Sequence, residues 1–591
     1  MDILDLLVPI LRGSKDEYGK DLVPPLPIAI DRVMENQPFK STAPIFQLPS
    51  DVLSIVLSHV DSNSLGNLAL VNSDCRQLAR SRQFASVCFD YGRTASELIS
   101  VLLQEKALRN LSNNALGGIG GAIGPCIRRL TVATNPGWVK HLHQIELTEE
   151  FNALEKSVRT ELLAKASEAF SKYQRCVESI ISGRTTLPHL ELLDWEDRAL
   201  LQQSFFEGLT TSSVQHLKLF RVEIDQEFEI AQPPISNRWN LRTLDMEIRW
   251  STKCFGEGET SPLCTSLLRS CSHSLETLGW YQTSSGSATF GSDPDKVPRL
   301  AKLRNLKPGF IHFSDSGTVD ALLEPSLSAL DLRYYDDALF QEAVRNRGPI
   351  PSLETLVFPI SKRSIDGYLE FLKANTQVSK LTILGGPDRK EEESYGDIPE
   401  TKILPVLSSS FKAIKSLRIR WNEGVSVIPD AALEIISGME TLEQVCLGAG
   451  PSWGWKYDWL IDHTSMRNYL SKLPRLKRIA FTRDSYENEI YYLHQFLSLE
   501  EMYASGLDYD APKEARVPIW EDGHKRRMVA EGQKYISSMP ELEWIFLGQY
   551  PMAVEKGAFE GDRQVVPLSG GRDSCETLLD RIFGCERFFP D

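Results

Sequence analysis

The chain has 591 residues, a formal net charge of −15 and a pI near 5.3. This charge argues against a general nucleic-acid binder, which needs a basic face to displace counterions from phosphates, and against docking on an anionic membrane. Hydrophobic residues at 42% and charged residues at 25% are ordinary globular values. No stretch approaches the roughly 20 apolar residues of a membrane span, and Asp2 and Asp5 stand where a signal peptide carries positive charge. We therefore expect a soluble protein of the cytoplasm, the nucleus or both.

The N-terminal region divides into an extension and a compact helical module. Residues 1–43 mix short apolar stretches with several prolines and predict little regular structure. Over residues 48–83, three short amphipathic segments predict three helices. Ser50 is expected to cap the first helix, and Asp51 suits its positive N-terminal end. So small a module carries more apolar surface than it can bury, so we expect a partner helix to cover it.

A linker and a helical insertion are expected next. Residues 91–126 hold a helix candidate and the glycine-rich run LGGIGGAIGP. This run is not a dinucleotide-binding loop, because Ile123 takes the place of the third glycine and no strand precedes it. The segment IRRLTV then predicts a first strand, and strong helix formers over residues 145–181 predict a long amphipathic helix inserted after it.

From residue 190 the chain repeats the phrase Leu-x-x-Leu-x-apolar, at an average spacing of about 29 residues, the upper edge of the leucine-rich-repeat range. Positions 1, 4 and 6 are apolar, and one strand cannot bury them alone. Stacked copies would form a parallel ladder with a continuous core and a concave strand face. Weaker copies are expected near Leu300 and Leu499. The clear copies begin at Leu190, Val214, Leu241, Leu275, Leu327, Leu353, Val378, Ile414, Leu442, Leu476 and Leu542.

The segment LPSDVLSIVLSHVDSNSLGNLALVNSDCRQLARS resembles the F-box family. That family often has a tryptophan near its basic residue, whereas this chain has Cys75 before Arg76. The long array looks like the degenerate repeats of F-box proteins from filamentous fungi. The residues that carry the resemblance are Leu48, Pro49, Asp51, Leu53, Ile55, Leu57, Asp61, Leu65, Leu68, Val71, Arg76 and Leu78.

The repeats and the resemblance together predict an α/β organisation: an extension (1–43), a three-helix F-box (44–90), a linker (91–126), and a leucine-rich-repeat solenoid with parallel strands on its concave face (127–591). The resemblance also implies that the F-box binds a Skp-type adaptor, which joins a cullin and a RING subunit, while the repeats present a protein substrate. An interaction scaffold without ubiquitin chemistry is the alternative. The implied adaptor-binding residues are Leu48, Pro49, Asp51, Leu53, Ile55, Leu57, Leu65, Leu68 and Val71.

We expect no catalytic chemistry, metal or cofactor. Residues 450–454 match the G-x-S-x-G nucleophile elbow and follow a strand, but no obvious helix start comes next. His141 and His143 could clip a metal, yet no cysteine or carboxylate stands at ligand spacing. The ten scattered cysteines form no CxxC pair, which predicts reduced, mostly buried thiols.

Both ends of a repeat stack need a cap, because an open end exposes core. We expect the F-box, the linker and the 145–181 helix to cover the first end. At the second end, a helical tail is expected to pack on the last strand near Leu542. Its candidate contacts are Leu568, Leu578, Leu579, Ile582 and Phe583.

The concave face is the expected substrate surface. Strand side chains alternate, so positions 5 and 7 of each copy should point away from the core. The residues at these positions run from acidic copies to basic ones, which predicts a protein substrate lying along a charge gradient. The candidate substrate-binding residues are Asp194, Glu196, Asp245, Glu247, Tyr281, Asp331, Arg333, Arg418 and Arg420.

Overall fold

A computed structural model gives the fold. Besides a few single residues and pairs, it describes residues 40–111, 121–145, 153–224, 226–232, 238–250, 261–282, 298–309, 316–324, 326–333, 338–360, 365–385, 397–421, 427–449, 461–482, 513–548, 550–557, 562–568 and 575–584.

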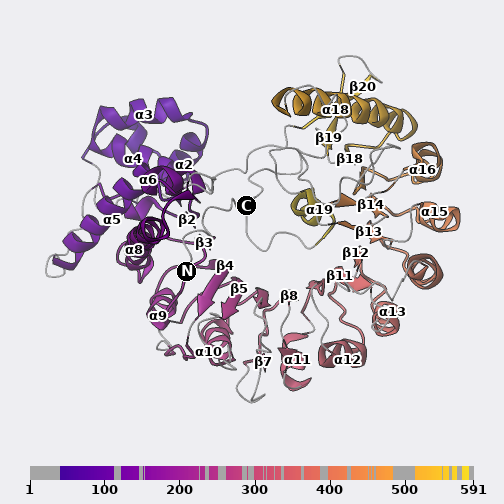
Figure 1. The fold of residues 1–591 in the computed structure, drawn as a ribbon, viewed down its shortest axis with the longest axis horizontal. Helices are drawn as coiled ribbons and strands as arrows, with labels where there is room; N and C mark the ends of the chain where they lie inside the picture. The colour runs from indigo at the N-terminus through magenta and orange to yellow at the C-terminus, as the bar shows by residue number, and fades with distance from the viewer. Residues whose placement is uncertain are drawn as a thin grey trace. The chain divides into compact units, whose positions relative to one another are not determined.

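The chain divides into two compact units, and each is described by itself below. Unit 1 comprises Val23–Glu324 and unit 2 comprises Pro325–Arg587, apart from terminal segments outside the described residues. Each unit is a mainly parallel β-sheet with helices between successive strands (Figure 1). Among the described residues, no helix is both long and apolar enough to cross a membrane.

Unit 1 begins with an N-terminal helical module, residues 40–85. A short 3-10 turn η2 (Pro44–Gln47) leads into three helices, α2 (Ser50–Ser58), α3 (Ser62–Val71) and α4 (Ser73–Gln83). The three helices expected over residues 48–83 are therefore present.

In the described part of unit 1, seven parallel strands form the main sheet, and their order in the sheet is their order in the chain. The first of them precedes the expected start of the repeats at residue 127, and its return helix is α5 (Arg93–Leu111). The last five residues of the expected linker, 122–126, are buried and include η3 (Gly124–Cys126). The strands are β1 (Ser86–Phe89), β2 (Arg129–Val132), β3 (Leu192–Trp195), β4 (His216–Ile224), β5 (Thr243–Trp250), β6 (Thr277–Gln282) and β8 (Asn305–Gly309).

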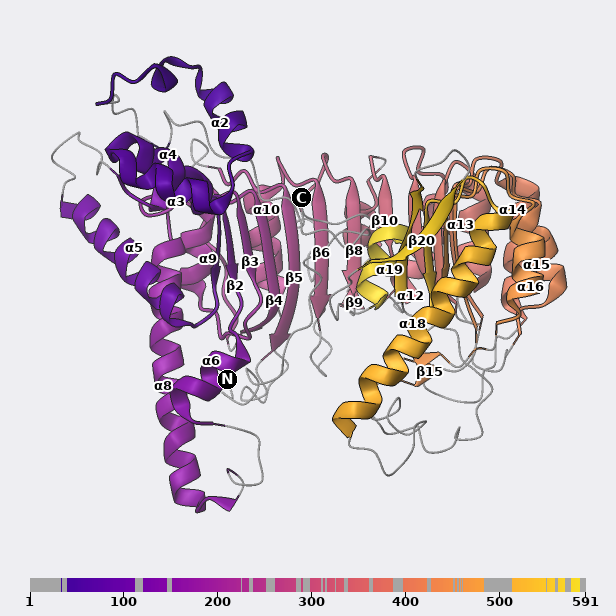
Figure 2. The same cartoon turned by 90° about the horizontal axis from the view of Figure 1, so that it is seen from above.

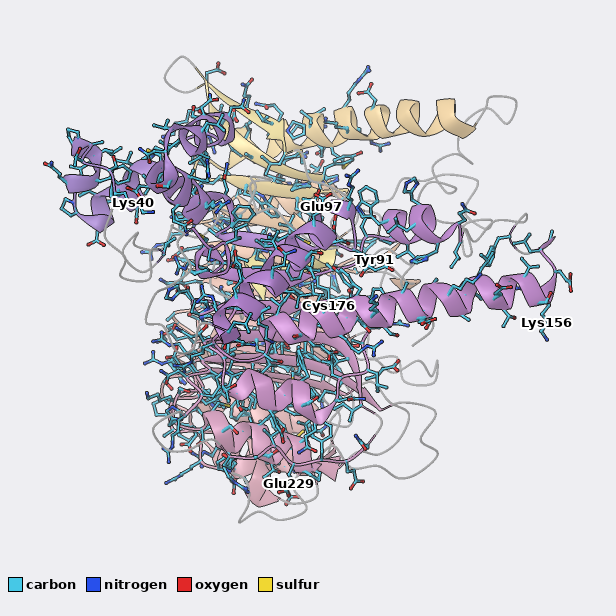
Figure 3. All side chains as sticks on the ribbon, turned by 90° about the vertical axis from the view of Figure 1, so that its left-hand side faces the viewer. Lys40, Tyr91, Glu97, Lys156, Cys176 and Glu229 are labelled. Atoms are coloured by element: carbon cyan, nitrogen blue, oxygen red, sulfur yellow. The ribbon has the colours of Figure 1, made fainter. Side chains whose placement is uncertain are left out.

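The expected helical insertion forms α8 (Lys156–Ile181), which starts eleven residues later than predicted and follows α6 (Pro136–His143). Its C-terminal part buries Phe170, Val177 and Ile181 in unit 1. Its N-terminal part extends away from the strands, with Cys176 near them and Lys156 at the far end (Figures 2 and 3). Helices α9 (Gln203–Thr210), α10 (Ser261–Cys271) and α11 (Ser316–Leu322) return the chain between later strands.

Unit 2 repeats the strand–helix pattern. The helices α12 (Ala338–Arg347), α13 (Ile365–Ala374), α14 (Leu404–Ser410), α15 (Asp430–Ser437) and α16 (His463–Leu470) lie on one side of its strands (Figure 1). The parallel strands are β10 (Ala329–Asp331), β11 (Thr355–Ile360), β12 (Lys380–Gly385), β13 (Ser416–Arg420), β14 (Gln444–Gly448), β17 (Arg478–Phe481) and β18 (Trp544–Leu547).

The repeat phrase occupies the expected positions in the strands. In the copy from Leu353, positions 1, 4 and 6 are Leu353, Leu356 and Phe358, and all three are fully buried. This confirms the predicted core positions. One weak copy is shifted, since β8 uses Leu303 and Leu306 rather than a start at Leu300, and the copy near Leu499 lies outside the described residues.

The sheet of unit 2 ends in an antiparallel hairpin. The strands β19 (Tyr550–Lys556) and β20 (Arg563–Pro567) pair beyond β18, and the long helix α18 (Lys513–Ser538) packs beside them. The guanidinium of Arg563 donates hydrogen bonds to the carbonyls of Ile536, Met539 and Leu542. The hairpin and α18 therefore close the sheet edge.

The last described helix, α19 (Cys575–Phe583), takes a different place from the one expected. It contacts β12, β13 and β14 on the side of the strands opposite α13, α15 and α16 (Figure 1). We call this side the strand face of unit 2. The predicted contact region was partly right, because the cluster around α19 includes Trp544 and Phe546 of β18. The predicted role as an end cap was wrong, because β19 and β20 occupy the edge.

Candidate functional site

The N-terminal helical module has its own small core and an apolar exterior. Its core contains Phe46, Leu53, Leu57 and Leu65, together with Cys126 from the turn before β2. Several large apolar side chains on the same helices nevertheless face solvent. These are Ile45, Leu48, Val52, Ile55, Val56, Leu70 and Val71. Exposed apolar groups gathered on so small a unit mark an interaction surface.

Short polar side chains set the helix boundaries of the module. The carboxylate of Asp61 accepts from the amides of Asn63 at 2.9 Å and Ser64 at 3.0 Å, and so caps α3. A hydrogen bond from the Ser64 hydroxyl, with those from the backbone, lowers the pKa of Asp61. The side-chain oxygen of Asn72 caps α4 in the same way, by accepting a hydrogen bond from the amide of Cys75. The expected cap at Ser50 was wrong, because α2 starts at Ser50 itself and Pro49 takes the N-cap position without a side-chain hydrogen bond.

The module is also tied to the chain on either side. The buried carboxylate of Asp74 accepts from the amides of Lys40 at 2.7 Å and Ser41 at 2.6 Å. The side-chain amide of Gln77 donates to the carbonyl of Ala122 at 2.8 Å. Because these bonds are buried, they fix the helices relative to the segments before η2 and before β2.

The predicted adaptor-binding residues fall into two groups. Leu53, Leu57 and Leu65 are buried in the module, and the half-buried Leu68 packs against the same core. Their side chains hold the helices together rather than face a partner. The remainder are exposed. Sequence reasoning missed four further exposed apolar neighbours, Ile45, Val52, Val56 and Leu70. The exposed predicted residues are Leu48, Pro49, Asp51, Ile55 and Val71.

A comparison with protein families decides what this module is. The F-box domain family matches residues 45–86, which covers η2, α2, α3 and α4. Residues 45–86 are an F-box domain. The match extends over a small part of the chain, and the exposed apolar side chains of the F-box helices lie within or next to it.

The remaining comparisons add little. No curated protein sequence matches the chain. Among solved structures, the chain is similar to one titled "Crystal structure of TLR13-ssRNA13 complex", at 16% identity and a TM-score of 0.26. The similar region covers 50% of this chain and 36% of that one, so the chain spans about a third of that structure's length. A likeness at this TM-score does not establish a shared fold.

On the strands of unit 1, the predicted acidic surface is mixed in charge. Strand register places Asp194 beside Lys218 and Lys218 beside Asp245. Sequence reasoning missed Lys218, because it considered only selected copies of the repeat. Lys307 also lies over the ring of Tyr281, at 5.3 Å from its centroid. The expected acidic end of the gradient is therefore a row of alternating charge.

Two glycines make room for predicted surface residues of unit 1. A Cβ at position 279 would lie 2.5 Å from a carboxylate oxygen of Asp245, and one at position 309 would lie 2.3 Å from the ring of Tyr281. Register pairs each of these glycines with the residue that it accommodates. Asp245, Glu247 and Tyr281 remain partly exposed.

Directly after β3, one residue of the predicted surface is buried instead of exposed. Glu196 is 7% exposed, so the expectation that it faces solvent was wrong. Next to it, Asp197 is buried and accepts from the amide of Thr134 at 2.6 Å and from its hydroxyl at 2.7 Å. Burial raises the pKa of Asp197 to about 6, although the two hydrogen bonds from Thr134 oppose the rise. The Asp197 carboxylate therefore connects the segment after β3 to the segment after β2.

On the strand face of unit 2, two of the predicted basic residues, Arg333 and Arg418, form ion pairs within the unit. The guanidinium of Arg418 contacts the carboxylate of Asp580 in α19 at 2.5 Å, and Arg333 pairs with the same carboxylate and with Asp331. Asp331 is fully buried, Arg333 is 8% exposed and Arg418 is 5% exposed. The expectation that these three face solvent was wrong, because Arg333 and Arg418 pair with Asp580 of α19 and Asp331 is buried against Arg333. Arg420 is partly exposed.

The C-terminal end of α19 completes this contact. The Thr382 hydroxyl donates to the carbonyl of Phe583 at 2.7 Å, and the Gln444 side chain donates to the carbonyl of Ile582 at 3.0 Å. The last carbonyls of a helix lack partners within the helix, so these two strand side chains satisfy them. The apolar residues Leu579, Ile582 and Phe583 pack on Cys446, Ala480, Trp544 and Phe546.

The shift in the pKa of Arg418 agrees with a close ion pair between Arg418 and Asp580. Burial alone would lower the pKa of Arg418, but the charge of Asp580 reverses the effect, and the net shift is upward. Burial raises the pKa of the neighbouring Cys446 thiol to about 11, although Arg418 opposes the rise. Cys446 is therefore a neutral thiol at physiological pH, and Arg418 keeps its charge.

The sequence candidates for catalysis have other surroundings in the structure. Ser452 of the G-x-S-x-G match lies in the two-residue strand β15 (Ser452–Trp453), which pairs antiparallel with β16 (Lys456–Tyr457). A nucleophile elbow instead turns from a strand directly into a helix. His143 shares a hydrogen bond of 2.9 Å with the hydroxyl of Tyr91. Within the described residues, no group of three potential metal ligands occurs.

Proposed function

We propose that this chain is the substrate-recognition subunit of an SCF-type E3 ubiquitin ligase. In this proposal the F-box docks onto a Skp-type adaptor, which joins a cullin–RING core. The two units act as a leucine-rich-repeat solenoid that binds a protein substrate, in the cytoplasm, the nucleus or both. The chain needs no cofactor and carries out no catalysis of its own.

The observation that carries the proposal is the exposed apolar surface of the F-box. Leu48, Val52 and Ile55 are between 41% and 56% exposed, while Leu53 and Leu57 of the same segment are at most 3% exposed. The F-box helices are thus apolar on two sides. One side packs in the core of the module, and the other side is exposed to solvent. F-box domains typically bind Skp-type adaptors, so an adaptor helix is the partner that this side fits.

The repeats supply a surface of the kind that binds proteins. In unit 1, neighbouring parallel strands present partly exposed side chains at position 5, Asp194, Lys218 and Asp245, and Glu247 at position 7. Repeat proteins commonly use such an extended face for binding. The charged residues of unit 1, Asp194, Asp245 and Glu247 with Lys218, are proposed to contact the substrate and to set partner choice and encounter rate.

Co-purification with the adaptor and cullin tests the proposal. A double variant, Leu48→Ala with Pro49→Ala, removes exposed contacts at the entry to α2, so it should no longer capture the adaptor, while its melting temperature stays close to that of the parent. Leu142→Ala is a matched control, since Leu142 is 53% exposed but lies outside the F-box. A double variant that still captures adaptor and cullin at parental levels would contradict the proposal and favour a scaffold without ubiquitin chemistry.

A further inference from the structure

A single row of side chains crosses the strand face of unit 2 and changes character along its length. Register aligns one residue from each of seven neighbouring strands. The row is mostly polar or charged over β10 to β13 and apolar over β14 to β18. Its members are Asp331, Val357, Thr382, Arg418, Cys446, Ala480 and Phe546.

Helix α19 is complementary to this row. Its carboxylate, Asp580, lies at the charged end between Arg333 and Arg418. Its apolar residues Leu579, Ile582 and Phe583 form one cluster with Cys446, Ala480 and Phe546 of the apolar part, while the Phe583 carbonyl accepts from Thr382 of the polar part. A short amphipathic helix laid in a groove, with apolar anchors and one charged contact, is a common mode of peptide recognition.

The sheet does not need α19 to close its edge. The hairpin β19–β20 and α18 already cover the strand edge beyond β18. Helix α19 has nine residues, whereas isolated helices shorter than about 12–15 residues are marginal in water. Contact with the strand face is therefore what keeps this segment helical. Asp580 is one-third exposed, so water reaches the rim of the contact.

The surroundings of α19 favour an acidic occupant. A pocket of about 300 Å³ opens beside α19, at the N-terminal ends of β12, β13, β14 and β17. On the strand side, three basic side chains and one carboxylate line it, and a fourth basic side chain, Arg581, belongs to α19 itself. The charged residues are Lys380, Lys415, Arg478, Arg581 and Glu443.

We propose that the strand face of unit 2 is the binding site for an acidic amphipathic helix of a partner protein, and that α19 occupies this site until the partner displaces it. This inference rests on the proposed function, and it names the class of substrate that the repeats accept. The partner helix must bring a carboxylate to the position of Asp580, because displacing α19 removes the carboxylate that two buried guanidiniums share. It must also bring apolar residues one turn further along.

A peptide binding experiment on the full chain tests this. The probe is a labelled synthetic peptide with the sequence of residues 572–587. The double variant Ile582→Ser with Phe583→Ser weakens the tethered helix but leaves the strand face intact. The peptide should bind this variant about tenfold more tightly than the parent chain, because in the parent the site is free only for a fraction of the time. Peptide binding should also raise the melting temperature of the variant.

The control is the same peptide with Asp580→Lys, which should lose binding to the variant. Equal peptide affinity for the variant and the parent chain, or unchanged binding of the peptide that carries Asp580→Lys, would overturn the inference. Should the variant fail to fold, hydrogen exchange on the parent decides. The amides of residues 579–584 should then exchange faster than those of α13, and equal protection would overturn displacement. Adaptor capture is measured on the same samples, so a chain that captures adaptor but binds no peptide fails this inference alone.

Discussion

The carboxylate of Asp580 pairs with two buried guanidiniums, those of Arg333 and Arg418. Removing one member of a buried pair costs far more than a surface pair is worth, because the remaining charge stays buried. We expect Asp580→Ala to lower the free energy of unfolding of unit 2 by about 2–4 kcal/mol. Chemical denaturation measures this.

The matched control for Asp580 is Arg93→Ala. Arg93 pairs with Glu97 at 2.8 Å, but both side chains are more than half exposed. Such pairs contribute about 0–1 kcal/mol, so this variant should unfold nearly like the parent. Equal effects of the two substitutions would show that Asp580 is not holding a buried network.

In unit 1, the buried carboxyl of Asp197 predicts a pH dependence of stability. Its pKa is about 6 in the folded chain, above its ordinary value of 3.8, because burial disfavours the charged form. The protonated form therefore stabilises the fold, and this contribution is complete below about pH 4 and is lost as the pH rises through 6. The melting temperature of the parent, relative to Asp197→Asn, should fall between pH 4 and pH 7. A difference that is constant over this range would contradict the raised pKa.

At the scale of elements, the helices of the F-box show what a sequence pattern can and cannot predict. Periodicity predicted three helices over residues 48–83, and α2, α3 and α4 are present. It could not tell which apolar residues face inward, because Val52 and Val56 stand next to Leu53 and Leu57 and all four are apolar. Only packing against Phe46 and Cys126 separates the buried pair from the exposed one.

Helix α19 shows a second limit. Its helical spacing and apolar residues were predictable, since they are local in the chain. Its location was not, because Asp580 meets Arg418 across 162 positions and Arg333 across 247. The sequence signal was present in part: an acidic residue within the apolar stripe of α19, and a basic residue at position 5 of the copy from Ile414.

The same helix gives a prediction about truncation. A chain ending at Leu568 keeps the β19–β20 hairpin but loses the cover over Trp544 and Phe546. Burial of Leu579, Ile582 and Phe583 is worth at most about 1.5–3 kcal/mol per side chain, before the cost of ordering the tail. The truncated chain should melt at a lower temperature and scatter light at high concentration. A chain as stable and as monodisperse as the parent would show that α19 is not held on the strand face.

At the scale of the whole molecule, the sequence predicted the repeated strand architecture well. It predicted less well how the two ends of the repeat array are built. Repetition of one phrase predicted parallel strands with buried positions 1, 4 and 6, because the same local pattern recurs in each copy. The ends break the pattern. In unit 1, β1 lies in the segment expected to belong to the F-box and α5 lies in the expected linker, and in unit 2, β19 and β20 turn antiparallel. Terminal repeats differ in sequence because they must present a polar outer face.

The most direct test of the account is a binding titration of a purified Skp-type adaptor against the full chain. The parent should bind it, and Ile55→Ala, which truncates a side chain that is 56% exposed on α2, should weaken binding by about tenfold, or about 1.4 kcal/mol, without changing the melting temperature. Leu142→Ala should bind like the parent. An adaptor that does not bind the parent chain, or binds Ile55→Ala with unchanged affinity, would contradict the claim that the apolar face of the F-box docks this protein to a ubiquitin ligase.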